Sequence, residues 1–299
     1  MNKIQKIIFN ILLKENRNIV NSYITCFGRN DGLGAQLHSI LSIFVVAKQY
    51  NLEYVHTPFK EIDHNRGDEE FLENFFDIGK NESNISSIGK EIKLKNIEHS
   101  FEISNNENYL YTTQACHNYC DKFPDNYLEI VEKFKSKFYY KFKNDYINYN
   151  NKGLNIGLHI RRGDVSRNNN NIRFTENTYY IEVLNNLFTF IKGLNLDINI
   201  HVYSQGTVDD FQEFANFDNV YYPLDEDILT TFYNLIESDI LVMSKSSLSY
   251  VSALLSNKVI IYQDFWHKPL TKWYNSKKLN SNSILNDIKN NFNLEKDAI

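Results

Sequence analysis

The chain has 299 residues, of which 42% are hydrophobic and 23% charged, and a formal net charge of −5 at pH 7. This composition supports a sizeable core, the length allows two ordinary domains, and the acidic balance argues against a nucleic-acid partner. Its three cysteines, Cys26, Cys116 and Cys120, are too few for a disulfide framework and fit a reducing compartment. His117 lies between two of them, but no second pair of ligands completes a zinc site.

The first predicted element is a short amphipathic helix at the N-terminus. Isoleucine and leucine recur there at helical spacing beside several lysines, at positions 4, 7, 8, 11 and 12. The run is too short to span a bilayer, and no small-residue cleavage site follows it. We expect the helix to pack on its domain, with weak contact to a membrane surface as the alternative. The protein is therefore expected to be cytoplasmic, or peripheral at the inner face of the membrane.

Residues 22–56 predict a βαβ unit. Ser22–Phe27 is an apolar, β-branched strand, and Leu52–His56 is a second strand. Between them lie a glycine-rich turn, 28–34, and a helix with apolar residues at helical spacing up to Tyr50. Gly32 and Gly34 would let the backbone approach a ligand at the helix start, although a tight structural turn explains them equally well.

A second alternation of strands and helices begins near residue 155, after a polar stretch at 144–153 that predicts a domain boundary. The two domains are therefore expected at 1–150 and at 151–299. Strands are predicted at 156–160, 198–203, 220–222, 239–243 and 259–262. Helices are predicted between them at 178–193, 208–215, 228–238 and 248–256. This order predicts a parallel, doubly wound sheet, and a last helix near 281–292 is expected to pack back on the first domain.

Ligands of such sheets bind beyond the carboxyl ends of the strands, which selects the turns at 28–34, 161–167, 204–207 (with Ser204), 244–247 and 263–267. The sharpest motif there runs from His159 to Asp164 and contains Arg161 and Arg162. Guanidinium groups match phosphate oxygens bidentately, and at a leaving nucleoside diphosphate they stabilise developing charge. A surface ion pair with Asp164 is the alternative.

Two further motifs lie beside strand ends. Ser246, Ser247 and Ser249 precede or begin a predicted helix, where hydroxyl and free N–H groups can bind a diphosphate; helix capping by one serine is the alternative. The run Asp225-Glu226-Asp227 is similar to a D-x-D metal site, but it precedes the helix at 228–238. Capping by Asp225 or Asp227 explains it without a metal, so no metal site is predicted.

Taken together, these motifs resemble those of the superfamily of α1,2-, α1,6- and protein O-fucosyltransferases. His159-Ile160-Arg161-Arg162-Gly163-Asp164 is similar to its H-x-R-R-G-D signature, 32–38 to its glycine loop, and 246–249 to its C-terminal serine motif. The run 35–38 is closest to the α1,6 branch. The resemblance covers about 23 to 265.

The resemblance implies an α/β fold of the GT-B type, with two Rossmann-like domains facing across a cleft, and inverting transfer of fucose from GDP-fucose without metal or cofactor. It implies a donor site of Gly32, Gly34, His159, Arg161, Arg162, Ser204, Ser246, Ser247 and Ser249. It implies an acceptor side in the domain at 1–150, a nucleotide-sugar site in the domain at 151–299, and a more critical role for Arg162 than for Arg161. The base is expected to be Asp164, Glu176 or an acid of the first domain, although Glu176 can instead cap a helix. A glycan acceptor, as in polysaccharide biosynthesis, completes the reaction. The alternatives are another nucleotide sugar, or a nucleotide- or glycan-binding module without catalysis.

Overall fold

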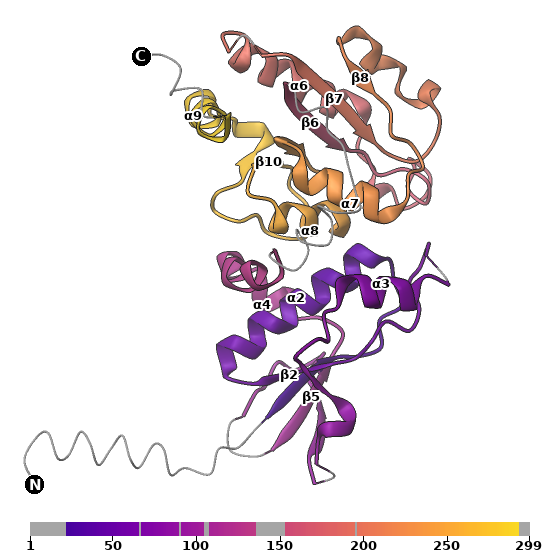
Figure 1. The fold of residues 1–299 in the computed structure, drawn as a ribbon, viewed down its shortest axis with the longest axis vertical. Helices are drawn as coiled ribbons and strands as arrows, with labels where there is room; N and C mark the ends of the chain where they lie inside the picture. The colour runs from indigo at the N-terminus through magenta and orange to yellow at the C-terminus, as the bar shows by residue number, and fades with distance from the viewer. Residues whose placement is uncertain are drawn as a thin grey trace, which may run out of the picture.

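The structure of this chain is a computed structural model that describes residues 22–65, 67–89, 91–104, 108–135, 153–194 and 196–292. These residues form two α/β lobes that follow one another along the long axis of the molecule (Figure 1). Each lobe holds one sheet in which all paired strands run parallel. The predicted fold class is confirmed: two Rossmann-like domains face each other across a cleft, which is the GT-B arrangement.

The first sheet has the strand order β3-β2-β1-β5-β4. The predicted βαβ unit is present, because β1 pairs with β2 in parallel and an 18-residue helix connects them. The elements of this lobe are β1 (Tyr23–Cys26), α2 (Leu33–Tyr50), β2 (Glu53–His56), α3 (Glu69–Phe76), β3 (Ser83–Asn84), a 3₁₀ turn (Ile85–Ser87), β4 (Lys93–Asn96), β5 (Tyr109–Thr113), α4 (His117–Cys120), a 3₁₀ turn (Pro124–Asn126) and a helix that includes 127–135.

The second sheet has the order β11-β10-β9-β6-β7-β8, with β6 near its middle. All six residues of β6 are buried, as expected for a central strand covered on both faces. The elements of this lobe are β6 (Leu154–His159), a 3₁₀ turn (Asn171–Arg173), α6 (Asn177–Ile191), β7 (Ile198–Tyr203), a 3₁₀ helix (Val208–Asn216), β8 (Val220–Tyr221), α7 (Ile228–Glu237), β9 (Ile240–Val242), α8 (Ser247–Leu255), β10 (Val259–Tyr262), β11 (Tyr274–Asn275), a 3₁₀ turn (Ser276–Lys278) and α9 (Ser281–Phe292).

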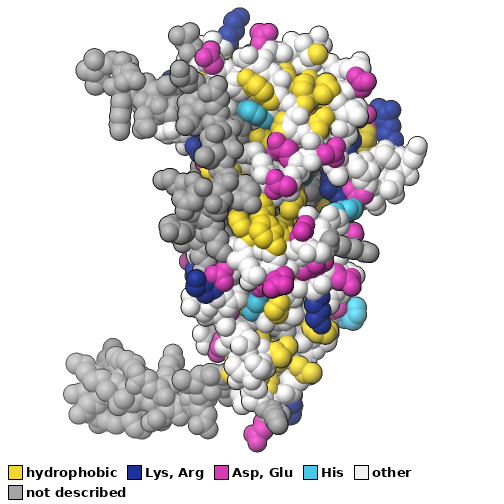
Figure 2. All heavy atoms as spheres, turned by 45° about the vertical axis from the view of Figure 1, so that its right-hand side comes forward, with side chains coloured by type: hydrophobic (Ala, Val, Ile, Leu, Met, Phe, Trp, Pro, Cys, Tyr) yellow, Lys and Arg dark blue, Asp and Glu magenta, His cyan; other side chains and the backbone are white. Residues whose placement is uncertain are grey.

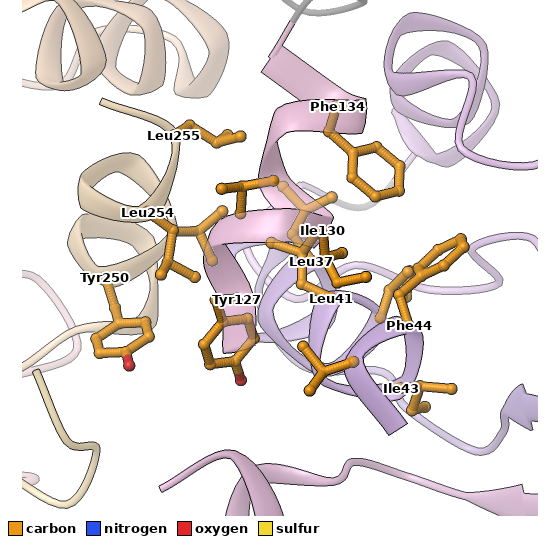
Figure 3. Close-up of a cluster of buried hydrophobic side chains, with 14 of the residues drawn as sticks. Leu37, Leu41, Ile43, Phe44, Tyr127, Ile130, Phe134, Tyr250, Leu254 and Leu255 are labelled. Atoms are coloured by element: carbon orange, nitrogen blue, oxygen red, sulfur yellow. The ribbon is translucent and has the colours of Figure 1, made fainter. Parts of the chain in front are cut away.

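One hydrophobic core joins the two lobes. Helix α2 of the first lobe packs against α8 of the second, and their buried side chains belong to one continuous cluster. Figure 3 shows this junction, where side chains of α2, of the helix at 127–135 and of α8 lie side by side: Leu37, Leu41, Ile130, Phe134, Tyr250, Leu254 and Leu255. The helix starts that border the cleft are therefore anchored in a packed interior.

One expectation is wrong. The last helix, α9, packs on the second domain and not on the first: it contacts α6 and β10, because Ile284 and Ile288 form a buried stripe one helical turn apart. The predicted helix at 208–215 is present as a 3₁₀ helix, with non-helical backbone at Phe211. Buried Phe211 and Phe214 are three residues apart, which suits 3₁₀ periodicity.

The N-terminal helix and the boundary at 150/151 lie outside the described residues. The two sheets do fall on either side of this boundary, at 23–113 and 154–275. Within the described segments, none of the helices combines the length and the apolar character needed to cross a bilayer.

Candidate active site between the two domains

The arginine motif follows directly on β6, at the carboxyl edge of the second sheet. Its chain reversal depends on Gly163, which has φ of +76°, and a Cβ there would lie 2.2 Å from Oε1 of Gln205. A larger residue would meet both backbone strain and this contact. The glycine therefore fixes the direction in which Arg161 and Arg162 leave the strand.

Arg162 is held in one orientation by neutral partners. Its guanidinium group donates to the Asn177 side-chain oxygen at 2.6 Å and to the Arg161 carbonyl at 2.9 Å, and its Cζ lies 4.4 Å from the centre of the Phe174 ring. Burial lowers the pKa of Arg162, but an arginine remains charged at neutral pH. Among the described residues no carboxylate forms an ion pair with it, so its charge is available to an anion.

Arg161 behaves differently, because it forms an ion pair with Asp164. The sequence analysis left an ion pair with Asp164 open as an alternative, and for Arg161 this ion pair is observed. The Asp164 carbonyl also accepts hydrogen bonds from Asn169 and Asn170, which fixes the loop. Arg161 still borders both parts of the cleft, so the ion pair sets its position at the cleft wall.

His159, the last residue of β6, links the arginine strand to the serine motif. Its Nδ1 lies 2.9 Å from the Ser244 hydroxyl, which lies 3.3 Å from that of Ser249. Burial, with a smaller contribution from Arg161, lowers the pKa of His159 to about 3, so the ring is neutral at pH 7. His159 lines the cleft, whereas Ser249 is fully buried and bonds to the carbonyls of Ser244 and Ser246. Ser249 therefore supports the loop and is not placed to contact a donor.

The start of α8 carries the other two serines. The Ser246 hydroxyl accepts a hydrogen bond from the Leu248 N–H at 3.2 Å, so the capping expected of one serine is present. Ser246 and Ser247 also line the cleft. Ser204, which donates to the Ile160 carbonyl at 2.7 Å, lines the part of the cleft nearest β7.

The glycine turn faces the serines from the first domain. A Cβ on Gly34 would lie 2.5 Å from the backbone of Leu248, so this glycine lets the starts of α2 and α8 approach closely. Gly32 has more space, since its nearest neighbour is the Asp63 carbonyl at 3.8 Å. Gln36 fixes the turn by donating to the carbonyls of Asp31 and Glu61, each at 2.7 Å. Gly34 therefore both allows the two helices to pack closely and borders the cleft.

These elements enclose two adjoining hollows that form one cleft between the domains. Figure 2 shows acidic, basic and histidine side chains mixed around the middle of the molecule, where the lobes meet. The first hollow lies over β6 and β7 and is lined by His159, Arg161, Arg162, Tyr203, Ser204 and Glu226. The second lies between the helix starts and is lined by Gly32, Gly34, Arg161, Arg173, Ser246 and Ser247. His64, Asn65, Arg161, Ile228 and Leu248 border both.

Asp227 caps α7, accepting from the N–H groups of Leu229 and Thr230 at 3.1 and 2.9 Å. Of the two capping residues that the sequence allowed, the structure selects Asp227. Asp225 instead has a left-handed backbone, with φ of 53°, and accepts from the Gly206 N–H at 3.2 Å. Burial and the neighbouring Asp227 raise the pKa of Glu226, which lies at the same wall of the first hollow.

The two acids proposed as catalytic base are in different positions. Asp164 lines the second hollow but is paired with Arg161. Glu176 forms two hydrogen bonds of 2.8 Å with Arg167, is half exposed and is not among the described residues that line the cleft. Its side chain does not cap α6 either. The roles that the sequence offered for Glu176 are therefore not supported.

Two residues that line the cleft, and one that supports it from behind Arg162, were missed from the sequence. His64 borders both hollows, with Nε2 3.6 Å from Asp63 and 4.0 Å from Asp164. Asn177 orients Arg162, and Arg173 lies with its Cζ 5.4 Å from the centre of the Trp266 ring. Arg173 had a signal, since it follows the arginine motif within one loop. His64 had none, because Asp164 and the rest of the cleft wall that it faces come from the other domain.

A scan against protein-family models gives no match, and a search of curated proteins gives none. Several solved structures are similar. POFUT1 in complex with GDP has 11% sequence identity and a TM-score of 0.42, covering 80% of this chain and 95% of the other. The fucosyltransferase NodZ from Bradyrhizobium has 10% identity and a TM-score of 0.45, covering 79% and 94%. At these scores the likeness adds nothing to the case for function, which rests on the site itself.

Proposed function

We propose that this chain is a glycosyltransferase that moves fucose from GDP-fucose to a glycan hydroxyl with inversion at the anomeric carbon. One observation carries the proposal: the starts of α2 and α8, from different domains, converge in one cleft with the arginine pair at the end of β6. The motif resemblance, including 35–38 with the α1,6 branch, supports the choice of fucose and of GDP.

The diphosphate is proposed to lie where the two hollows meet. Helix starts offer free N–H groups and a positive dipole end, and Arg161 borders both hollows. Arg162 is already oriented by Asn177 and Phe174, so little reorganisation is needed when charge develops on the leaving GDP. The arginines are thereby expected to stabilise the transition state more than the bound donor.

The nucleoside is proposed to occupy the first hollow, over β6 and β7. Its wall carries Ser204, Asp225 and Glu226, whose oxygens can accept hydrogen bonds. Guanine presents N–H donors along one edge, and ribose presents hydroxyls, so an acidic wall suits guanosine. In this proposal cationic groups bind the diphosphate, and oxygen acceptors bind the nucleoside.

His64 is the proposed proton acceptor for the attacking hydroxyl. It borders both hollows, so it lies where a donor sugar and an acceptor would meet, and Asp63 and Asp164 flank its ring. An imidazole at this position can accept the proton of an attacking hydroxyl. Asp164 remains the alternative base, since it lines the second hollow.

We further propose that transfer needs no metal, because arginines and helix starts already supply positive charge. Asp227 is committed to capping α7, so the 225–227 run is a poor set of ligands. The acceptor is proposed to be a polysaccharide precursor made in the cytoplasm. The free, buried cysteines fit such a reducing compartment.

A donor panel tests this function. The purified chain would be incubated with GDP-fucose, GDP-mannose, UDP-galactose and UDP-N-acetylglucosamine, and release of nucleoside diphosphate measured with and without an oligosaccharide mixture. We expect slow hydrolysis of GDP-fucose that rises with acceptor. Turnover of another donor alone would establish a transferase of different specificity. GDP binding without turnover of any donor would indicate a binding module, an outcome favoured by the pairing of both Asp164 and Glu176 with arginines.

A further inference from the structure

Three histidines from distant parts of the chain meet at the packed junction of the domains, away from the residues that line the cleft. His38 lies on α2, His117 begins α4, and His267 follows β10, so the first two belong to one domain and the third to the other. One ligand atom from each lies within 4.8 Å of the other two. The ring centres are 4.1 Å apart for His38–His117, 4.4 Å for His38–His267 and 4.7 Å for His117–His267.

Each ring has a buried nitrogen without a hydrogen-bond partner: Nδ1 of His38, Nε2 of His117 and Nδ1 of His267. His38 is 1% exposed and His267 is 5% exposed, so bulk water does not satisfy these rings. A buried, unsatisfied polar atom is costly, and native proteins contain few of them. Three such atoms in one cluster call for a shared partner, and that partner must accept electron pairs or donate hydrogen bonds.

Polar groups lie beside two of the rings. Nε2 of His38 lies 3.0 Å from the Tyr127 hydroxyl, so Nδ1 of this ring is the nitrogen left for a ligand. In Figure 3 the Tyr127 hydroxyl points away from the apolar side chains. Metal-bound histidines commonly have such a neighbour on the other ring nitrogen, which orients the ring. An Asp121 oxygen lies 3.5 Å from Nδ1 of His267, so this carboxylate stands beside the proposed ligand atom itself.

The number and kind of ligands suit zinc, which accepts three histidines with one further ligand. Zn–N bonds of about 2.0–2.1 Å would place the nitrogens roughly 3.3 Å apart, so the ligand atoms, now within 4.8 Å, would draw together.

We propose that His38, His117 and His267 bind one divalent transition-metal ion, zinc by preference, which fixes the two domains to each other. Asp121 is near enough to Nδ1 of His267 to complete the coordination, and its other oxygen accepts from the Lys268 N–H at 2.9 Å. The flanking thiols are not ligands: the Cys120 sulfur, for example, contacts the Ser42 carbonyl at 3.7 Å. This ion is structural, apart from the glycosyl transfer.

The test uses the full chain without a histidine tag, stripped of metal by a chelator and dialysed. Co²⁺ is added while the visible absorption is recorded, and Zn²⁺ is then added in competition. We expect one equivalent of Co²⁺ to give the intense bands of a tetrahedral site, and Zn²⁺ to abolish them. Zinc should also raise the melting temperature of the stripped chain. Absence of Co²⁺ bands together with an unchanged melting temperature would overturn the proposal.

Variants assign the ligands. His117→Gln and His267→Gln should each lose the Co²⁺ bands and the zinc-dependent rise in melting temperature. His99→Gln, at an exposed histidine outside the cluster, should behave as wild type. Wild-type Co²⁺ spectra in both cluster variants would contradict this assignment. If a cluster variant fails to fold, the spectrum and stoichiometry of the wild-type chain still decide whether a tetrahedral site with imidazole ligands exists.

Discussion

Two polar clusters lie at the junction of the domains, and they differ in how their polar atoms are satisfied. In the cleft, Arg162 has neutral partners, Arg161 has a carboxylate partner, and both line open hollows. In the histidine cluster the rings are packed together, and three nitrogens are buried without partners. The first arrangement suits a ligand that enters and leaves with each turnover. The second suits an ion that stays bound.

At this interface the start of a helix and the buried face of the same helix have different roles. The starts of α2 and α8 border the cleft, whereas the face of α2 that carries His38 is buried farther along the same contact. One pair of helices can thus shape a reaction site and a structural site within a short distance. Substitution of Arg162 or His64 in the cleft should change binding or turnover with little effect on stability, and substitutions in the histidine cluster should do the reverse.

The largest effect is expected for His64→Gln. If His64 accepts the proton of the attacking hydroxyl, kcat should fall about 10²- to 10⁴-fold, while GDP affinity stays near that of wild type. Steady-state kinetics with GDP-fucose and calorimetry with GDP measure the two quantities. His99→Gln is the matched control. A full kcat in His64→Gln, with a large loss in Asp164→Asn, would transfer the role to Asp164.

His159 should make stability depend on pH. Its pKa is about 3 in the folded chain, against 6.5 unfolded, so the unfolded state binds more protons and stability is lost as pH falls below 6.5. Between pH 7.5 and 5.5 this amounts to about 1.4 kcal/mol. Urea unfolding at both pH values should show a loss smaller by this amount in His159→Asn. Equal losses in the two chains would mean that His159 is protonated in the folded state.

A double variant, Ser246→Ala with Ser247→Ala, separates helix capping from phosphate binding. Loss of the cap should lower the free energy of unfolding by about 1 kcal/mol. If the hydroxyls also contact the diphosphate, affinity for GDP should fall more than affinity for guanosine, which has no phosphate. A lower melting temperature with an unchanged ratio of GDP to guanosine affinity would show that the serines are only structural.

The smallest effect is expected from brief treatment with EDTA. Because the arginines and helix starts supply the positive charge, turnover of GDP-fucose should change little, and added Mn²⁺ or Mg²⁺ should not increase it. Zinc content measured in the same samples separates this question from the histidine site. Activity that is lost with EDTA and restored by Mn²⁺ at unchanged zinc content would make the acids at 225–227 the first candidates for metal ligands.

Much of the second sheet could be predicted from the sequence. The strands there are rich in apolar residues, continuously so in β9 and β10, and β7 and β10 have the predicted bounds. The arginine pair stood out because charge at the end of a buried strand needs a partner. Between 60 and 120 the hydrophobic pattern does not predict the strands. β3 has only two residues, and β4, Lys93–Asn96, is largely exposed and does not alternate between buried and exposed residues.

The contacts between domains could not be predicted, because they join residues far apart in sequence. Gly34 meets Leu248, and His64 meets Asp164, only once both domains have folded. The same holds for the histidine cluster, whose members are separated by 79 residues or more and have no ligand spacing to detect. An ion pair within one loop, such as that between Arg161 and Asp164, could be predicted from the sequence.

Calorimetry with GDP on wild type and Arg162→Ala tests the central claim most directly, since the claim assigns the diphosphate to this oriented arginine. The account predicts that Arg162→Ala remains folded and loses about 2–5 kcal/mol of GDP binding free energy, with a much smaller change for guanosine. Arg167→Ala, at an exposed arginine that pairs with Glu176, should bind GDP as wild type does. Wild-type GDP affinity in a folded Arg162→Ala chain would contradict the account.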